Sequence, residues 1–238
     1  IAPKIRDIGL EMTAITSMSP ETNPVSPDKK IRDAGAEHLK RIIDCAEIIG
    51  SPVIGGPFHS CFKEFTKKVP TGEEMKWSSE VMRAAAEYGQ KSDIILAPEA
   101  LNRFECYLIN TSAQARELCR LVDHSHFGYH FDTHHANIEE KNTGESIKLS
   151  AKEIKHVHIS ENDRGTPGSG QCPWEGIFKN LHEINYDSWL TIEAFVSSVP
   201  DFSEHINVWR DFSPQDEVYT EGIKFIKKMW KKYSLANN

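Results

Sequence analysis

Short apolar runs alternate along the chain with longer segments in which apolar residues recur every three or four positions. Runs of about four to eight apolar residues are typical of buried strands, and the longer periodic segments are typical of amphipathic helices. The pattern therefore predicts six strands separated by helical sequence. The predicted strands are Leu10–Ser17, Pro52–Phe58, Ile94–Glu99, Phe127–Asp132, Ile154–Ser160 and Trp189–Phe195.

Local signals mark where the intervening helices begin and end. Ser26-Pro27 predicts an N-cap followed by proline at the first helical position, and Gly50 predicts the end of that helix. Capping-box spacing predicts two further helix starts, at Thr71–Glu74 and Thr111–Gln114. This repeated alternation of strand and helix predicts a parallel sheet with helices packed outside it.

Two architectures fit the alternation, a doubly wound sheet and a (β/α) barrel. No GxGxxG follows a strand, no GxxxxGK[ST] occurs, and the glycine loop Gly165–Gly170 lacks the lysine of a phosphate-binding loop. The sequence thus disfavours a nucleotide-binding doubly wound sheet. Because no linker or internal repeat divides the chain, we expect residues 1–238 to form a single domain.

Four of the predicted strands end in an ionisable side chain that an apolar core would not accommodate alone. These residues are Glu99, Asp132, His158 and Glu193. The carboxyl ends of parallel strands meet at one mouth of a barrel, so we expect the four side chains to converge there. Three carboxylates repel one another without a cation, and this oxygen-rich set with one nitrogen suits Mn²⁺, Mg²⁺ or Co²⁺. Unrelated caps at separate strand ends are the alternative.

A metal ion with four protein ligands keeps about two positions of an octahedron for substrate oxygens. The carbonyl and the neighbouring hydroxyl of a sugar could fill them, and the ion would then polarise the carbonyl and favour an enediolate. The proton lost in that step needs general bases, for which Glu99 and Glu193 are the candidates.

Four ordered motifs resemble the ketose 3-epimerases, which belong to the xylose isomerase-like sugar epimerases and isomerases. The motifs are PEALNRFE (Pro98–Glu105), DTHHANIEE (Asp132–Glu140), HVHISENDRGTPGSG (His156–Gly170) and YDSWLTIEAF (Tyr186–Phe195). The resemblance implies an α/β fold of the TIM (β/α)8-barrel family. It also implies epimerisation of a small-molecule ketose at carbon 3 through an enediolate, with a divalent metal ion, most readily Mn²⁺, as cofactor.

The resemblance assigns roles to individual residues. The metal ligands would be Glu99, Asp132, His158 and Glu193. Two of these, Glu99 and Glu193, would also be the catalytic acid/base pair on opposite faces of the substrate. Substrate oxygens would be held by Glu105, His135 and Arg164. The alternative for Arg164 is a surface ion pair with Glu161 or Asp163.

The number of strands predicts an incomplete barrel. A closed barrel of this type has eight strands, and the resemblance begins just before the third. We therefore expect strands 3–8 of the barrel, with the first two β/α units absent and with Leu10–Ser17 and Trp189–Phe195 at the edges. Exposed edge strands favour self-association, so a homo-oligomer is expected.

Charge and composition narrow the range of partners and compartments. The chain has 28 Lys and Arg against 35 Asp and Glu, a net charge of −7, which disfavours a nucleic-acid partner. No apolar run approaches the roughly 18 residues of a membrane span, so no membrane partner is expected. The five cysteines are odd in number and lack CxxC spacing, which predicts reduced thiols and a cytoplasmic location.

Other functions remain open on the sequence alone. An aldose–ketose or hydroxypyruvate-type isomerase, or a keto-inositol-processing enzyme, could use the same metal and carboxylates on the same scaffold. A metal-dependent DNA-repair endonuclease with a related barrel shares an Asp-Thr-x-His pattern, but the negative charge disfavours DNA binding. A non-catalytic sugar- or metal-binding protein is a third class, and the presence of both Glu99 and Glu193 argues against it.

Overall fold

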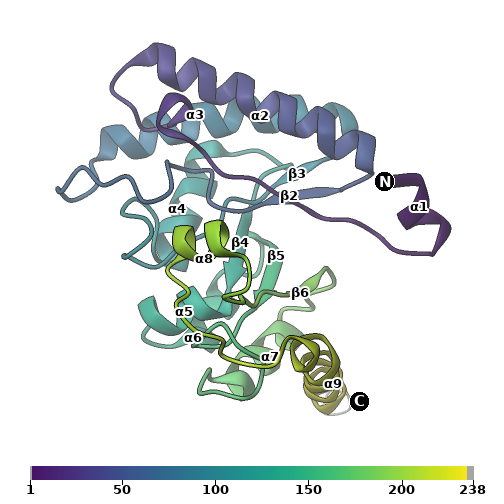
Figure 1. Cartoon of the computed structure of the whole chain (residues 1–238). Coiled ribbons are helices and arrows are strands. Elements are labelled where there is room, and N and C mark those ends of the chain that lie inside the picture. Colours follow the sequence, from purple (N-terminus) through teal and green to yellow (C-terminus); the bar gives the residue numbers. More distant parts are fainter. Residues whose placement is uncertain (1, 235–238) are drawn as a thin grey trace. The chain divides into compact units, whose positions relative to one another are not determined.

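A computed structural model describes residues 2–234, and within them six strands alternate with helices as the sequence predicts (Figure 1). The strands are β1 (Ala14–Ile15), β2 (Val53–Gly55), β3 (Ile95–Leu96), β4 (Tyr129–Asp132), β5 (Ile154–Ile159) and β6 (Leu190–Ile192). Each lies inside its predicted range but is shorter. The predicted ranges are longer because an apolar run marks buried side chains, and side chains are buried beyond the few residues whose backbones pair.

The strands form two parallel three-stranded sheets, in the orders β1-β2-β3 and β4-β5-β6. In the first, Val53 of β2 lies opposite Ile95 of β3, and in the second, Val157 of β5 lies opposite Leu190 of β6. Isolated parallel bridges between Leu96 and Phe127 and between Glu99 and His130 continue the pairing of β3 with the chain that enters β4. The predicted parallel arrangement is confirmed, with β1 and β6 at ends of their sheets.

Helices precede and follow the strands. They are α1 (Ala2–Asp7), α2 (Lys29–Ile49), α3 (Gly72–Gly89), α4 (Ser112–Val122), α5 (Thr133–Glu139), α6 (Thr143–Leu149), α7 (Trp174–Glu183), α8 (Pro200–Ile206) and α9 (Gln215–Ser234), with short 3-10 turns η1 (Pro20–Thr22) and η2 (Gln90–Ser92). Among these helices, none is long and apolar enough to cross a bilayer within the described residues.

The predicted helix ends are confirmed with one correction. Thr71 and Thr111 each begin a helix with a complete capping box, and Gly50 closes α2 in the left-handed conformation. The N-cap of α2 is Asp28, not Ser26, because the Asp28 carboxylate accepts the backbone N–H of Lys30. A carboxylate one residue after the proline competes for the same role and adds a favourable charge at the helix start.

The chain divides into two compact units. The first comprises residues up to Phe131 together with Lys152–His156, and the second comprises Asp132–Ala151 and the residues from Val157 onward. The single domain expected from the sequence therefore stays a prediction.

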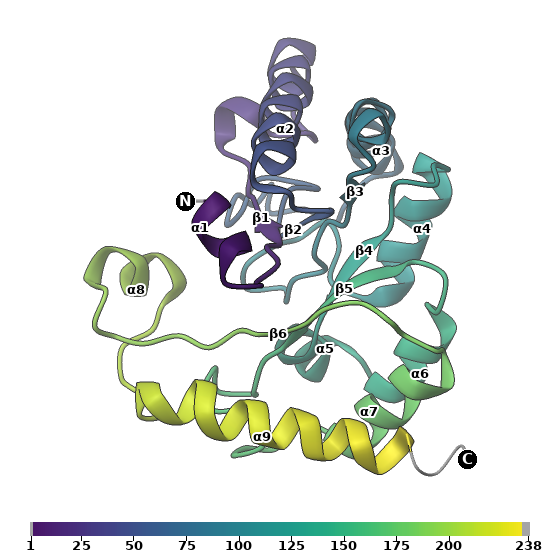
Figure 2. The same cartoon turned by 90° about the vertical axis from the view of Figure 1, so that its right-hand side faces the viewer.

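The first unit holds the sheet β1-β2-β3 and the helices α2, α3 and α4. Helix α2 packs against α3, and both lie on the same side of this sheet (Figures 1 and 2). Leu39 and Ile43 of α2 and Met82 of α3 are fully buried. The buried residues of α2, which are Gly35, Leu39, Ile43 and Ala46, recur every three to four positions, as in an amphipathic helix.

The second unit holds α5 to α9 and the carboxyl ends of β4 and β5, together with β6. Helix α7 packs against α6 and against α9 (Figure 2). The predicted inward-facing residues of α7, Ile177, Phe178 and Leu181, are fully buried. Burial of each such side chain contributes roughly 1.5–3 kcal/mol to folding.

We expect Gly168→Ala to destabilise the second unit by about 2–4 kcal/mol. Gly168 has a φ of +89°, and an added Cβ would lie 2.5 Å from Cδ2 of Phe225 on α9. Chemical denaturation measures the free energy of unfolding. Gly176→Ala is the control, because a Cβ at Gly176 on α7 meets no atom closer than 4.0 Å. Equal stability of the two variants would contradict the tight packing of this loop on α9.

Candidate functional site

Three of the predicted metal ligands lie together in the second unit. Asp132 is the last residue of β4, His158 lies near the end of β5, and Glu193 directly follows β6. His158 Nδ1 is 3.2 Å from Glu193 Oε1 and 3.8 Å from Asp132 Oδ2. Each residue offers one ligand atom, and these atoms lie within 4.8 Å of one another. This buried cluster of carboxylates and imidazole could bind a metal ion.

The strand register explains why these side chains meet. In the parallel pairing of β5 with β6, His158 lies opposite Thr191 and Ile159 lies opposite Ile192. Glu193 is therefore the first residue after the paired part of β6. The N–H of Glu193 donates to the carbonyl of Ile159 at 3.2 Å, which holds the backbone of Glu193 next to the end of β5. Side chains that follow neighbouring parallel strands point to one mouth of the sheet.

The hydroxyl of Thr133 connects the end of β4 to the end of β5. Thr133 Oγ1 donates to the carbonyl of Ser160 at 2.7 Å and accepts the N–H of Ser160 at 2.7 Å. Asp132, next to Thr133, also caps α5, since its Oδ1 accepts the N–H of His135 at 2.9 Å. One Asp132 oxygen is therefore committed to the helix, and the other faces the cluster.

Arg164 reaches into the same cluster from the loop after β5. Its Nη1 donates to Glu193 Oε2, to Ser160 Oγ at 2.9 Å and to Asp132 Oδ2 at 3.4 Å. Its guanidinium carbon lies 4.9 Å from the ring centre of Phe195. The side chain is buried, so the alternative of a surface ion pair with Glu161 or Asp163 is wrong. Arg164 instead pairs with Asp132 and Glu193, whose negative charges its guanidinium balances.

His135 completes this group. Arg164 Nη2 lies 3.0 Å from His135 Nε2, and because a guanidinium only donates, Nε2 must accept. His135 is therefore a neutral imidazole. Burial and the adjacent Arg164 hold the pKa of His135 well below its ordinary value, in agreement with that assignment. The neighbouring His134 instead donates from Nδ1 to the carbonyl of Glu161 at 3.1 Å.

The two carboxylates of the cluster differ in acidity. Burial raises the pKa of Asp132 to about 7, although Arg164 opposes that rise. Burial also raises the pKa of Glu193, but Arg164 and His158 outweigh it and hold that pKa well below its ordinary value. Glu193 is thus an anion at neutral pH, whereas Asp132 is partly protonated. A cation bound at the cluster would displace the proton from Asp132.

Glu99 and Glu105 belong to the first unit. Glu99 is buried beyond the end of β3, where its N–H donates to the carbonyl of Gly56 at 2.9 Å. Its Oε2 lies 3.6 Å from Nδ1 of the buried His130. Glu105 Oε1 accepts from Asn102 Nδ2 at 3.2 Å. Their roles as ligand, base and substrate contact stay predictions.

Sequence reasoning missed Glu161 and Phe195. It treated Glu161 as a surface partner for Arg164, whereas its side chain is fully buried. The sequence predicts Phe195 only as the end of a strand, whereas in the structure its ring lies against the guanidinium of Arg164. The available signal is a glutamate four residues before the glycine-rich loop, because such loops expose backbone N–H groups that can donate to a carboxylate.

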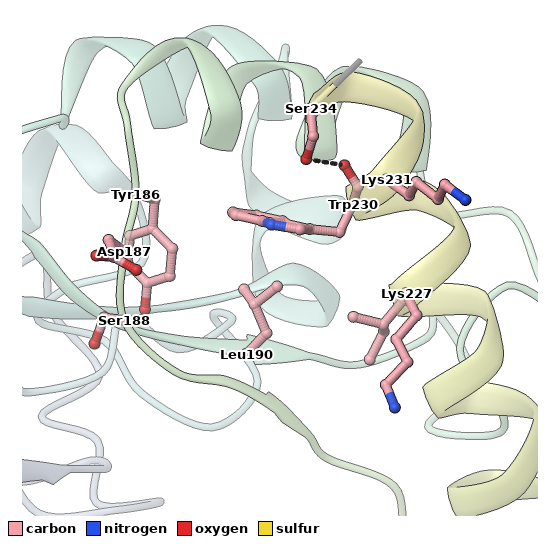
Figure 3. Close-up of a pocket in the computed structure, with 9 residues that line it drawn as sticks. Tyr186, Asp187, Ser188, Leu190, Lys227, Trp230, Lys231 and Ser234 are labelled. Carbon is pink, nitrogen blue, oxygen red and sulfur yellow. Dashed lines mark hydrogen bonds between the residues drawn. The ribbon is translucent and has the colours of Figure 1, made fainter.

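A separate hollow lies between β6 and α9 in the second unit (Figure 3). It has a volume of about 500 Å³. Figure 3 shows the ring of Trp230, on α9, beside Leu190 and Tyr186, and Lys227 also lines the hollow from α9. No predicted site residue lines it. The candidate site is therefore the cluster at the strand ends and not this hollow.

Comparison with known proteins connects this geometry to sugar enzymes. A family described as the xylose isomerase-like TIM barrel matches residues 1–229. A probable ketose 3-epimerase of Synechocystis sp. is 30% identical over 223 residues, which are 93% of this chain and 78% of that protein. The D-psicose 3-epimerase of Ruminiclostridium cellulolyticum is 32% identical over 206 residues, covering 86% of this chain and 70% of the relative.

Solved structures show the same similarity. An L-ribulose 3-epimerase structure superposes with a TM-score of 0.94 at 27% identity, covering 99% of this chain and 80% of the other. The D-allulose 3-epimerase of Methylomonas sp., solved in complex with D-allulose, gives a TM-score of 0.91 at 26% identity over 96% of this chain and 80% of that one.

Proposed function

Because the chain belongs to the xylose isomerase-like TIM-barrel family, we propose that it is an isomerase that epimerises a ketose at carbon 3 with the help of a divalent metal ion. The observation that carries the proposal is the cluster of the buried Asp132 and His158 with the partly buried Glu193, into which Arg164 reaches. The relatives named as ketose 3-epimerases supply the substrate class. Like them, this chain would act on a small-molecule ketose.

The donor set fits a hard divalent cation. Asp132 and Glu193 offer carboxylate oxygens and His158 offers an imidazole nitrogen, and we propose Glu99 as the fourth ligand. Such a set suits Mn²⁺, with Mg²⁺ or Co²⁺ as substitutes. When bound, the ion would polarise the substrate carbonyl and stabilise negative charge that develops on its oxygen.

The neighbouring polar residues would orient the sugar. Arg164 carries several donors in a rigid fork and would hold substrate oxygens near the carbonyl. His135, held neutral, and Glu105 would contact the same oxygens.

The two glutamates would move the proton at carbon 3. Glu193, an anion at neutral pH, would remove the proton from one face and leave an enediolate. Glu99 would return a proton to the other face, which inverts the configuration without any change of oxidation state. A later exchange of protons with water would reset the pair.

A substrate panel tests this proposal. D-fructose, D-tagatose and L-ribulose, each with Mn²⁺, should give the matching carbon 3 epimer by chromatography. Conversion to an aldose alone would replace the proposal with an aldose–ketose isomerase. A 3-keto glycoside belongs in the panel, because a 3-dehydro-D-guloside 4-epimerase of Escherichia coli is 27% identical over 165 residues.

Arg164→Ala should raise KM for the ketose about 10- to 100-fold, because charge-assisted hydrogen bonds to the substrate are lost. The fall in kcat should be smaller. Steady-state kinetics measure both. Arg210→Ala, which removes an exposed arginine from the same unit, is the control and should leave KM unchanged. Unchanged kinetics together with a lower unfolding temperature would show that Arg164 is purely structural.

A further inference from the structure

The carboxylate of Glu161 is buried at the centre of the loop that carries Arg164. Its Oε1 accepts the backbone N–H groups of Asn162 and Cys172, each at 3.0 Å. Its Oε2 accepts the N–H of Gly168 at 2.8 Å and the indole N–H of Trp174 at 3.0 Å. A carboxylate can only accept, and it has about four lone-pair positions, so these N–H donors satisfy it.

These four donors span the whole loop. Asn162 follows Glu161 directly, Gly168 lies in the glycine-rich stretch, and Trp174 is the first residue of α7. One side chain thus fixes the beginning, the middle and the end of residues 162–174. Burial raises the pKa of Glu161, but the hydrogen bonds from Asn162, Cys172 and Gly170 together outweigh it and lower that pKa below its ordinary value. The carboxylate is therefore charged when it holds the loop.

The main chain of Arg164 depends on the same loop. Arg164 has a φ of +67°, a left-handed conformation that is unfavourable for a residue with a side chain. Its N–H donates to the carbonyl of Glu161 at 3.0 Å, and its carbonyl accepts the N–H of Phe195 at 3.0 Å. This conformation persists only if the surrounding loop enforces it.

We propose that Glu161 is a positioning residue, whose carboxylate holds residues 162–174 in the conformation that brings Arg164 to Glu193, Asp132 and His135. The part of this inference that concerns turnover rests on the proposed function. Glu161 would not touch the substrate or the metal ion. It would act through Arg164, by setting the path of the chain on either side of it.

Glu161→Gln tests the carboxylate with almost no change in volume. Each oxygen of the carboxylate accepts two N–H groups. In either orientation, the amide NH₂ therefore replaces one of these oxygens and two hydrogen bonds are lost. The matched control is Glu175→Gln, which makes the same chemical change at an exposed residue on α7. A second variant, Trp174→Phe, keeps a ring in place and removes one of the four donors.

Hydrogen–deuterium exchange of backbone amides measures the loop directly. Exchange within residues 162–172 should be at least about tenfold faster in Glu161→Gln than in the wild type or Glu175→Gln, since hydrogen bonds to a charged group are lost. Protection equal to the wild type would overturn the proposal. If Glu161→Gln does not fold, Trp174→Phe decides, with about fivefold faster exchange expected in the loop and no change there as the contradicting result.

A double-mutant cycle then tests whether the effect passes through Arg164. Glu161→Gln should raise KM for a ketose about tenfold, and the double variant with Arg164→Ala should be no worse than Arg164→Ala alone. Fully additive effects would overturn the positioning role. A wild-type protein without epimerase activity would refute the proposed function only, because the exchange measurement on the loop does not depend on turnover.

Discussion

Glu193→Gln should abolish detectable epimerisation while the fold survives. Glu193 is the carboxylate whose pKa lies lowest in the cluster, and it lies against both His158 and Arg164. The amide is nearly isosteric, but it cannot accept the carbon 3 proton and is a weaker metal ligand. Loss of a general base typically lowers the rate by about 10²- to 10⁴-fold.

The control for this variant is Glu183→Gln, an exposed glutamate at the end of α7 in the same unit. Circular dichroism and the unfolding temperature should show both variants folded. Turnover of Glu183→Gln should match the wild type. Wild-type rates of carbon 3 hydrogen exchange in folded Glu193→Gln would remove Glu193 from the mechanism.

Removal of divalent metal should lower the rate at least about 100-fold, and addition of Mn²⁺ should restore it. Lewis-acid stabilisation of the developing charge contributes several kcal/mol to such reactions. Because the ion binds the folded protein, Mn²⁺ should also raise the unfolding temperature. This second measurement does not depend on activity.

Asp132→Asn is the matched variant for the metal prediction. It removes a charge from the cluster and keeps the side-chain shape, so Mn²⁺ should no longer raise its unfolding temperature by the wild-type amount. Full turnover by chelator-treated protein that contains no measurable divalent metal would contradict the metal requirement.

The arrangement of strands and helices was readable because it depends on local pattern. Apolar runs marked all six strands, and the capping boxes at Thr71 and Thr111 marked helix starts to the residue. Strand length was overestimated, since an apolar run records burial and not backbone pairing. The start of α2 was misplaced because Ser26 and Asp28 are both good caps, and only the three-dimensional path of the chain chooses between them.

The candidate site was predictable where it depends on strand ends. Asp132, His158 and Glu193 were named from their positions after apolar runs, and the structure brings them together in one unit. Contacts made by loops were not predictable. The ion pair of Arg164 with Glu193 and the donors around Glu161 join residues that no periodicity relates, through a loop that turns at positive φ.

The most direct test of carbon 3 chemistry is NMR of a ketose incubated with the Mn²⁺-loaded enzyme in deuterium oxide. Two-base epimerisation returns the proton from a group that exchanges with solvent. The account therefore predicts deuterium at carbon 3 of the epimer from the first turnover, and its gradual appearance at carbon 3 of the recovered substrate. An epimer that retains its original hydrogen at carbon 3, or deuterium confined to carbon 1, would contradict it.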